Sequence, residues 1–201
     1  MKNRNYDFPI HLVFKISTLS NDFTATDTHG VTLAYVRQKM FKLKEDIQIF
    51  NDENKSSILY RIRANKWIDF SAAYEITDEQ ANRRLGRIAR KGWASLWKAK
   101  YEIFNEEDNH VYTIREENAW AKVMDGLLGE IPLLGFLTGY LFNPKYAISN
   151  LNGDVVYRMS KVPSFWGRKF DLERLIDDEE NDETLVMLST MMMVLLERRR
   201  G

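Results

Sequence analysis

The chain has 201 residues, which suits one domain or at most two small ones, and this length can bury a sizeable core without disulfides. Its composition is 44% hydrophobic and 12% aromatic, which excludes a disordered chain. Lysine plus arginine equals aspartate plus glutamate at 29 each, so the whole chain has no net attraction for nucleic acid or an anionic membrane. Any electrostatic function must therefore come from a local patch, and we expect no nucleic-acid partner.

The absence of cysteine excludes disulfides, thiolate zinc sites and a cysteine nucleophile, and it fits a reducing compartment. Near the N-terminus, the apolar stretch from Phe8 to Phe14 is short, is interrupted by Pro9 and runs into Lys15. Since the apolar region of a signal peptide is uninterrupted, Pro9 and His11 argue against one here. We therefore expect a cytoplasmic protein.

A pattern of alternating large apolar residues recurs along the chain. Tyr74-Glu75-Ile76 and Tyr101-Glu102-Ile103 lie 27 residues apart, and Tyr146-Ala147-Ile148 begins a third copy. A large apolar residue follows eleven positions after the tyrosine in each copy, and an earlier version runs from Ile47 to Ile62. Alternation with a period of two is typical of a strand that has one buried face.

Turn-forming residues separate the two halves of these copies, at Asn51–Asn54, Asn105–Asn109 and Asn152-Gly153. Such clusters between alternating segments predict β-hairpins, with polar residues such as Arg61 and Arg63 facing outward. Hairpins in series imply a large antiparallel sheet, and a sheet of roughly ten or more strands tends to curl or close. The unequal spacing of the copies argues against a propeller or a solenoid.

The segment from Leu185 to Leu196 is apolar except for Ser189 and Thr190, and its leucines and methionines favour a helix. A helix that is apolar on every face must be surrounded by other parts of the protein. Twelve residues rise about 18 Å, whereas a bilayer core of about 30 Å needs about 20 residues. We therefore expect a buried central helix over residues 184–197 and no transmembrane span.

An acidic run, Asp177–Glu183, precedes this segment, and Arg198-Arg199-Arg200 follows it. Acidic residues suit the N-terminal end of a helix dipole and arginines suit the C-terminal end. A calcium site is the alternative interpretation of the acidic run, because calcium prefers oxygen ligands, but the run lacks the spacing and the central glycine of an EF-hand. We expect no metal site and no cofactor.

The strongest local anomaly is a basic stretch that contains no acid and has two interleaved tryptophans. Such residues suit an anionic membrane or a phosphoinositide headgroup, and tryptophan is common at membrane interfaces. The alternative is the solvated face of two strands with the tryptophans in the core, and alternation would direct only about half of the charges one way. The candidate headgroup-binding residues are Arg83, Arg84, Arg87, Arg90, Lys91, Trp93, Trp97, Lys98 and Lys100.

A second apolar block runs from Leu127 to Phe142. Gly135 and Gly139 in this block match a packing motif of membrane helices, but Pro132 and three glycines disfavour a spanning helix. We expect a short helix near residues 121–128, then a turn and an inward-facing strand. The alternative is an exposed hydrophobic loop that binds a protein partner or lipid.

The order of these parts carries a family resemblance, through Arg37-Gln38-Lys39-Met40-Phe41, Ile47-Gln48-Ile49-Phe50-Asn51, the two Tyr-Glu-Ile motifs and the closing apolar segment. From about Asp27 to Leu196 the chain resembles the LURP-one-related proteins. These belong to the tubby C-terminal-like superfamily, which also includes the phospholipid scramblases. The resemblance implies a single domain over residues 1–201, a closed antiparallel β-barrel of about twelve strands around the C-terminal helix.

Within that superfamily, tubby proteins bind phosphoinositides, and scramblases are linked to calcium and lipid movement. The chain has no G-x-S-x-G, Walker, dinucleotide-binding or H-E-x-x-H motif, and its histidines are scattered, with His110 expected to be solvated in a turn. We therefore expect a non-enzymatic domain that binds phospholipid or phosphoinositide headgroups, in the cytoplasm or peripherally at a membrane. The alternatives are a protein-interaction or structural domain and, less favoured, a scramblase-like lipid transporter.

Overall fold

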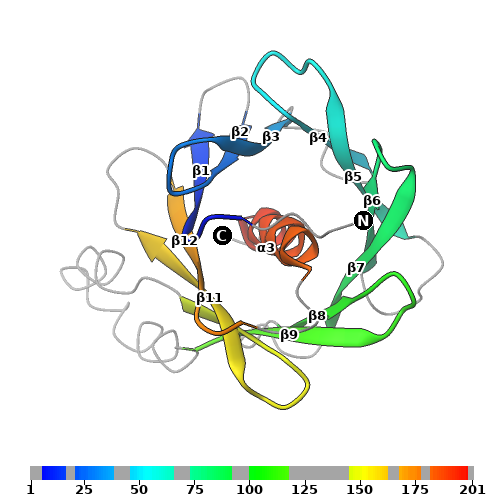
Figure 1. Ribbon diagram of the computed structural model, residues 1–201, viewed down its shortest axis with the longest axis vertical. Helices are drawn as coiled ribbons and strands as arrows, with labels where there is room; N and C mark the ends of the chain where they lie inside the picture. The colour runs from blue at the N-terminus through cyan, green and yellow to red at the C-terminus, as the bar shows by residue number, and fades with distance from the viewer. Residues whose placement is uncertain are drawn as a thin grey trace, which may run out of the picture.

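The computed structural model describes residues 6–16, 21–38, 46–65, 73–91, 100–117, 145–162, 168–177 and 182–198. Within these ranges, strands form a closed antiparallel barrel around one helix on its axis (Figure 1). The strands are β1 (Ile10–Ile16), β2 (Asn21–Thr26), β3 (Thr32–Gln38), β4 (Asp46–Phe50), β5 (Ile58–Asn65), β6 (Ala73–Asp78), β7 (Arg83–Lys91), β8 (Lys100–Phe104), β9 (His110–Glu116), β10 (Lys145–Ser149), β11 (Val155–Val162) and β12 (Arg168–Arg174). The helix is α3 (Glu183–Arg198).

Each strand pairs with its neighbours in sequence, and β1 pairs with β12 to close the barrel. Closure leaves no free strand edge in the barrel, so every strand is paired on both sides. The predicted twelve-stranded barrel around a C-terminal helix is therefore confirmed. The helix is one residue longer at each end than the predicted range 184–197.

Short turns connect five strand pairs at the same end of the barrel, which we call the hairpin end. These turns span residues 27–31, 51–57, 79–82, 105–109 and 150–154. An aspartate or asparagine begins or immediately precedes each turn, and its side-chain oxygen accepts backbone N–H groups two to six residues later. These residues are Asp27, Asn51, Asp78, Asn105 and Asn150. Each turn also contains a residue with positive φ, namely Gly30, Lys55, Asn82, Asp108 or Gly153.

All five hairpins contain a β-bulge where the second strand leaves the turn. The extra residue of each bulge is apolar and lies in the core or packs against it: Leu33, Leu59, Leu85, Val111 and Val156. A bulge changes the facing of the residues beyond it. The repeat predicts that Leu85 is equivalent to Tyr112 and Tyr157, and the register corrects this. Tyr112 and Tyr157 each pair with the isoleucine of their own copy, whereas in the first copy Ile76 pairs with Gly86.

The helix α3 begins at the hairpin end. The carboxylate of Asp182 caps it by accepting the N–H of Leu185 at 2.9 Å, and burial raises the pKa of Asp182. Leu185 also approaches Gly86 at the start of β7. Every side chain from Leu185 to Leu195 is buried, including Ser189 and Thr190. The apolar segment is thus surrounded by the barrel, as its composition predicts.

The residues before β1 lie across the hairpin end and bind the first turn of α3. The backbone N–H of Tyr6 donates to the buried carboxylate of Glu183 at 2.6 Å, and the Tyr6 hydroxyl lies 3.0 Å from the Thr184 hydroxyl. Arg174, the last residue of β12, donates to the same carboxylate at 2.5 Å and lies over the ring of Phe8. This buried network closes the hairpin end around the start of the helix.

Among the described residues, no helix is long and apolar enough to cross a bilayer. This agrees with the length argument made from the sequence. The outward direction of Arg61 and Arg63 is also confirmed, because both contact Asp46 on the outer face.

Candidate functional site

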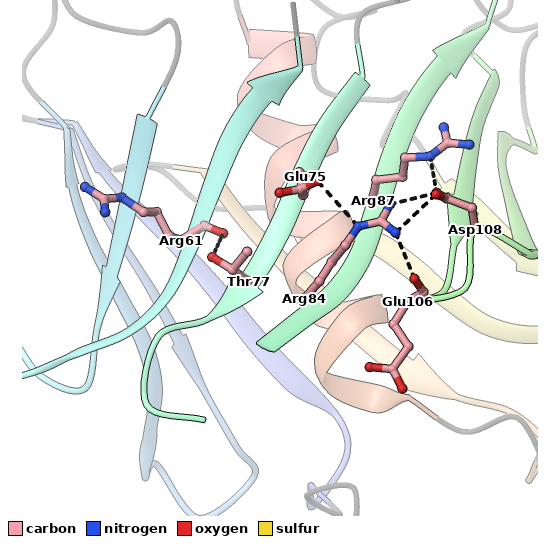
Figure 2. Close-up of polar contacts among 7 residues, drawn as sticks. All are labelled: Arg61, Glu75, Thr77, Arg84, Arg87, Glu106 and Asp108. Carbon is pink, nitrogen blue, oxygen red and sulfur yellow. Dashed lines mark hydrogen bonds and ion pairs between the residues drawn. The ribbon is translucent and has the colours of Figure 1, made fainter. Parts of the chain in front are cut away.

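Strand β7 carries most of the predicted headgroup-binding cations. Strict alternation would put Arg84 and Arg87 on opposite faces of the sheet. The bulge instead pairs Arg84 with Thr77 and Gly86 with Ile76, whose side chain is buried. Both arginines therefore lie on the outer face, side by side, as Figure 2 shows.

Two guanidinium groups meet at one carboxylate in this face. Asp108, in the turn between β8 and β9, accepts hydrogen bonds from Arg84 Nη2 at 2.7 Å and from Arg87 Nε at 2.8 Å. These bonds hold the pKa of Asp108 at about 2, well below its usual range. The Arg87 guanidinium also lies 3.6 Å from the centroid of the Phe104 ring. The turn and β7 are thus joined by charge and by a cation–π contact.

Further carboxylates balance the remaining charge. Arg84 Nε lies 3.4 Å from Glu75 on β6 (Figure 2). Arg83 Nη1 lies 3.4 Å from Glu106 in the β8–β9 turn. The basic stretch contains no acid in sequence, but the neighbouring strand and turn supply three. The charges of Arg83, Arg84 and Arg87 are therefore largely neutralised.

The far ends of β7, β8 and β9 have a different arrangement. Lys91 is the register partner of Lys100, and Lys100 is the register partner of Arg115. Like charges at directly opposite positions destabilise a sheet. Lys100 is ion-paired, because its Nζ lies 2.7 Å from a carboxylate oxygen of the buried Glu102. We call Lys91, Lys100 and Arg115 the basic row.

Arg90 belongs to neither group. It lies two positions after the inward-facing Ile88 and is the register partner of the buried Tyr101, so it faces the interior. Its Nε atom is buried and has no hydrogen-bond partner among the described residues. The remaining candidates Trp93, Trp97 and Lys98 lie outside the described residues, and their role stays a prediction.

The two ends of the barrel carry opposite charge. Lys55 is the only lysine or arginine in the five turns of the hairpin end, whereas the turns contain the carboxylates of Asp27, Asp52, Glu53, Glu79, Glu106, Glu107, Asp108 and Asp154. At the other end, which we call the basic end, described side chains near the strand termini include the cations Arg63, Arg90, Lys100, Arg115, Lys145, Lys161 and Lys169. The carboxylates there are Asp46, Glu75, Glu102, Glu116 and Glu117. The zero net charge of the chain therefore conceals a separation of charge between the ends.

Sequence reasoning missed Arg115 and Lys145, and it missed the three acids that bind the arginines. The signal that identifies them is strand register, since the residues come from separate strands and turns. The 27-residue repeat does place Glu106 and Asp108 one hairpin after β7. A register worked out from that repeat could have paired them with Arg83 and Arg84.

The acidic run has a structural role where it is described. Asp182 caps α3 and Glu183 binds Tyr6 and Arg174, while Asp177 forms an exposed ion pair with Arg174 at 3.4 Å. The described residues contain no group of three or more potential metal ligands. Residues 178–181 of the run and the Leu127–Phe142 block lie outside the described residues.

His110 differs from its expected solvated position. It is the first residue of β9 and is half-buried, and its Nε2 lies 3.0 Å from the carbonyl oxygen of Tyr112. On the outer face of β1, His11 Nδ1 lies 2.8 Å from Asp171 Oδ1 of β12. Both rings therefore have hydrogen-bonding contacts within the barrel wall.

The fold is a closed antiparallel barrel whose interior is filled by a helix. A sequence model of the LURP-one-related family matches residues 32–193, which cover most of this barrel and most of α3. The chain belongs to the LURP-one-related family. Comparison with curated proteins and with solved structures found no match.

Proposed function

We propose that this chain is a non-enzymatic domain that binds anionic phospholipid or phosphoinositide headgroups through the basic end of its barrel. Of the predicted candidates, Lys91 and Lys100 lie in the basic row at this end, and Arg115 adds to them, whereas Arg90 faces the interior. The interior of the barrel is occupied by α3, so binding takes place on the outside. In this proposal the protein is cytoplasmic and reaches the membrane peripherally.

The basic row is the observation that carries the proposal. Lys91, Lys100 and Arg115 occupy successive register positions across three strands. Among the described residues, the carboxylate beside the row is that of Glu102, so three cations leave a net positive charge that a phosphate placed over the row would offset. Arg83, Arg84 and Arg87 are contacted by three carboxylates, which would compete with a phosphate more strongly than the single carboxylate beside the basic row.

Charge separation between the two ends supports the same orientation. The acidic hairpin end is repelled by an anionic membrane, while the basic end is attracted to it. At about 1 kcal/mol for each cation near the surface, a row of three supplies only weak, millimolar attraction. Useful affinity therefore requires a headgroup with more than one phosphate or a contribution from side chains beyond the row.

Vesicle sedimentation tests the proposal. The full chain is mixed with vesicles of phosphatidylcholine alone, with added phosphatidylserine, or with added phosphatidylinositol bisphosphate. Replacing Lys91, Lys100 and Arg115 together with alanine is expected to weaken binding to the anionic vesicles by about 100-fold, at about 1 kcal/mol per charge. The matched control replaces Arg83, Arg84 and Arg87 with alanine and is expected to have a smaller effect.

Binding that does not depend on anionic lipid would contradict this function. Equal binding by the basic-row variant and the parent chain would also contradict it, and a larger loss in the control would assign the site to the ion-paired arginines. In those cases the alternative is a protein-interaction domain, for which Leu127–Phe142 stays the predicted contact segment. A scramblase-like activity would require α3 to leave the barrel, and the burial of Leu185–Leu195 gives that activity no support.

A further inference from the structure

The segment immediately before β1, residues 6–9, lies outside the strand ladder of the barrel. We call this segment the N-terminal strap. The register of β1 begins at Ile10, and the strap meets the β2–β3 turn through a long hydrogen bond, 3.4 Å from the N–H of Thr28 to the carbonyl oxygen of Asp7. Detachment of the strap would therefore leave the described strand pairs of the barrel intact.

The shorter polar contacts of the strap are made with the first turn of α3. The backbone N–H of Tyr6 donates to Glu183 at 2.6 Å, and the Tyr6 hydroxyl lies 3.0 Å from the Thr184 hydroxyl. The side chain of Glu183 is 0% exposed, although that of its partner Arg174 is 30% exposed. Because a buried carboxylate is unfavourable without its hydrogen bonds, loss of the Tyr6 donor would favour exposure of Glu183 to water.

The same turn contains the cap of α3. Asp182 accepts the N–H of Leu185 through its carboxylate at 2.9 Å and the N–H of Val186 through its backbone carbonyl at 3.0 Å. Tyr6 binds the two residues that lie between Asp182 and Leu185. Because helix ends fray where tertiary contacts do not hold them, release of Tyr6 would also loosen the bonds of Leu185 and Val186.

We propose that the N-terminal strap is a latch that opens together with the first turn of α3 while the barrel stays closed. In the open state, Glu183 and Arg174 face water and the start of the helix is accessible. Because this opening breaks few contacts, it requires less free energy than global unfolding. A ligand that binds Tyr6 or Phe8 of the released strap would shift the population toward the open state. The latch lies at the end opposite the basic row and does not depend on lipid binding.

Native-state amide hydrogen exchange of the full chain, followed by NMR at low urea concentrations, tests the latch. The amides of Tyr6, Leu185 and Val186, which we call the latch amides, are expected to share one opening free energy. Their exchange should be nearly independent of urea, because the opening exposes little surface. Amides in the barrel strands, such as that of Ile88, should exchange more slowly and with a strong dependence on urea.

Two variants separate the latch from the barrel. Tyr6→Phe removes the hydroxyl contact with Thr184 and is expected to speed exchange of the latch amides roughly fivefold. Ile62→Val removes a buried methylene group from β5 and is expected to speed exchange of the strand amides by roughly the same factor, while the latch amides stay unchanged. Asp7→Ala changes an exposed side chain of the strap, so it is the matched control and should alter neither group.

The response of the latch amides to the barrel variant is decisive. Latch amides that speed up in Ile62→Val together with the strand amides would show that the strap opens only with the whole barrel, and this would overturn the proposal. Unchanged exchange of Leu185 and Val186 in Tyr6→Phe would overturn it as well, and so would a Tyr6 amide that has no protection in the parent chain.

Discussion

The two ends of this barrel differ in how they are built and in the charge they carry. At the hairpin end, five short turns repeat the same aspartate or asparagine, the same positive-φ residue and the same bulge, and the start of α3 is fixed by Glu183. At the basic end, the strand termini carry cations, and like charges face each other in the basic row. The hairpin end is therefore stabilised by local contacts, whereas the basic row has more cations than the one carboxylate of Glu102 can balance.

This difference distinguishes residues that stabilise the fold from residues that are candidates for ligand binding. Residues with satisfied partners, such as Arg84 and Arg87, contribute to holding the hairpin end together, although the sequence alone suggested them as ligand contacts. Unfavourable charge arrangements at a protein surface are more informative about ligands, because a ligand can relieve them. Substitutions at the hairpin end should thus change stability, and substitutions in the basic row should change binding.

The largest effect is expected from Leu188→Asp, which would destabilise the whole barrel by disrupting its central helix. Leu188 is fully buried in α3, and a carboxylate there would be buried without a partner. This costs several kcal/mol, a large part of the roughly 5–15 kcal/mol that stabilises a typical domain. The variant is expected to lack a cooperative thermal transition by circular dichroism. Leu151→Asp, at an exposed turn position, is the control and should melt like the parent; a cooperative, parent-like transition in Leu188→Asp would refute a buried helix.

A substitution of Gly86, the residue after the bulge in β7, tests the close approach of β7 to Phe104. A Cβ at this position would lie 2.1 Å from the carbonyl oxygen of Phe104, and the φ of +154° is unfavourable for other residues. Gly86→Ala is expected to lower the free energy of unfolding by about 3 kcal/mol, combining backbone strain with overpacking. Gly30 has a φ of +79° but open space around it, so Gly30→Ala should cost only about 1 kcal/mol. Urea denaturation measures both, and equal losses would show that the close approach to Phe104 has no effect.

Glu183→Gln tests how firmly the hairpin end holds α3. The change removes the charge that Arg174 contacts at 2.5 Å, and the carboxylate it replaces is fully buried. Because Arg174 remains partly exposed, we expect a loss of about 2 kcal/mol in urea denaturation, less than for a fully buried pair. The matched control is Asp177→Asn, which removes an exposed partner of the same arginine and should cost less than about 0.5 kcal/mol. Similar losses in the two variants would indicate that burial of Glu183 is unimportant.

The smallest effect concerns Asp108 and pH. Its pKa of about 2 in the folded protein lies below the ordinary 3.8, so its contribution to stability is present above pH 3.8 and is lost as the pH falls toward 2. The side chain is about half exposed, so solvent screening limits this contribution to about 0.5–1 kcal/mol at pH 7. Asp108→Asn should show that deficit in urea denaturation at pH 7 and a smaller one at pH 3. Glu107→Gln in the same turn is the control; a deficit in Asp108→Asn that is constant with pH would exclude the ion pairs as its cause.

Much of the fold was predictable because its signals are local. Alternation from Tyr101 to Ile103, turn residues such as Asn105 and the apolar run from Leu185 each specify one element without reference to the rest of the chain. The hairpins and the apolar run alone indicated a large antiparallel sheet and a buried helix, and the closed barrel was implied by the family resemblance. The bulges were not predictable from alternation, because adding Leu85 to one strand changes the facing of Arg84 without changing the residue types.

The candidate site was predicted less well, for a related physical reason. Arg83, Arg84 and Arg87 are adjacent in sequence, but their carboxylate partners come from β6 and the β8–β9 turn. Whether a cation is paired depends on strand register, which a one-residue shift alters. The basic row depends on the same register, so Arg115 could not be recognised as a neighbour of Lys100 from spacing alone.

The position of α3 after the last strand has a consequence for the order of folding during synthesis. His11 and Asp171, in the two strands that close the barrel, are 160 residues apart, and the core helix follows both. The early hairpins can form as they emerge from the ribosome, but their inward-facing apolar residues have no partner in the centre until Leu185–Leu195 has been made. Contacts of such long range make folding slow. The nascent barrel therefore exposes its interior surface for most of its synthesis, which is the period when chaperone binding or aggregation would compete with folding.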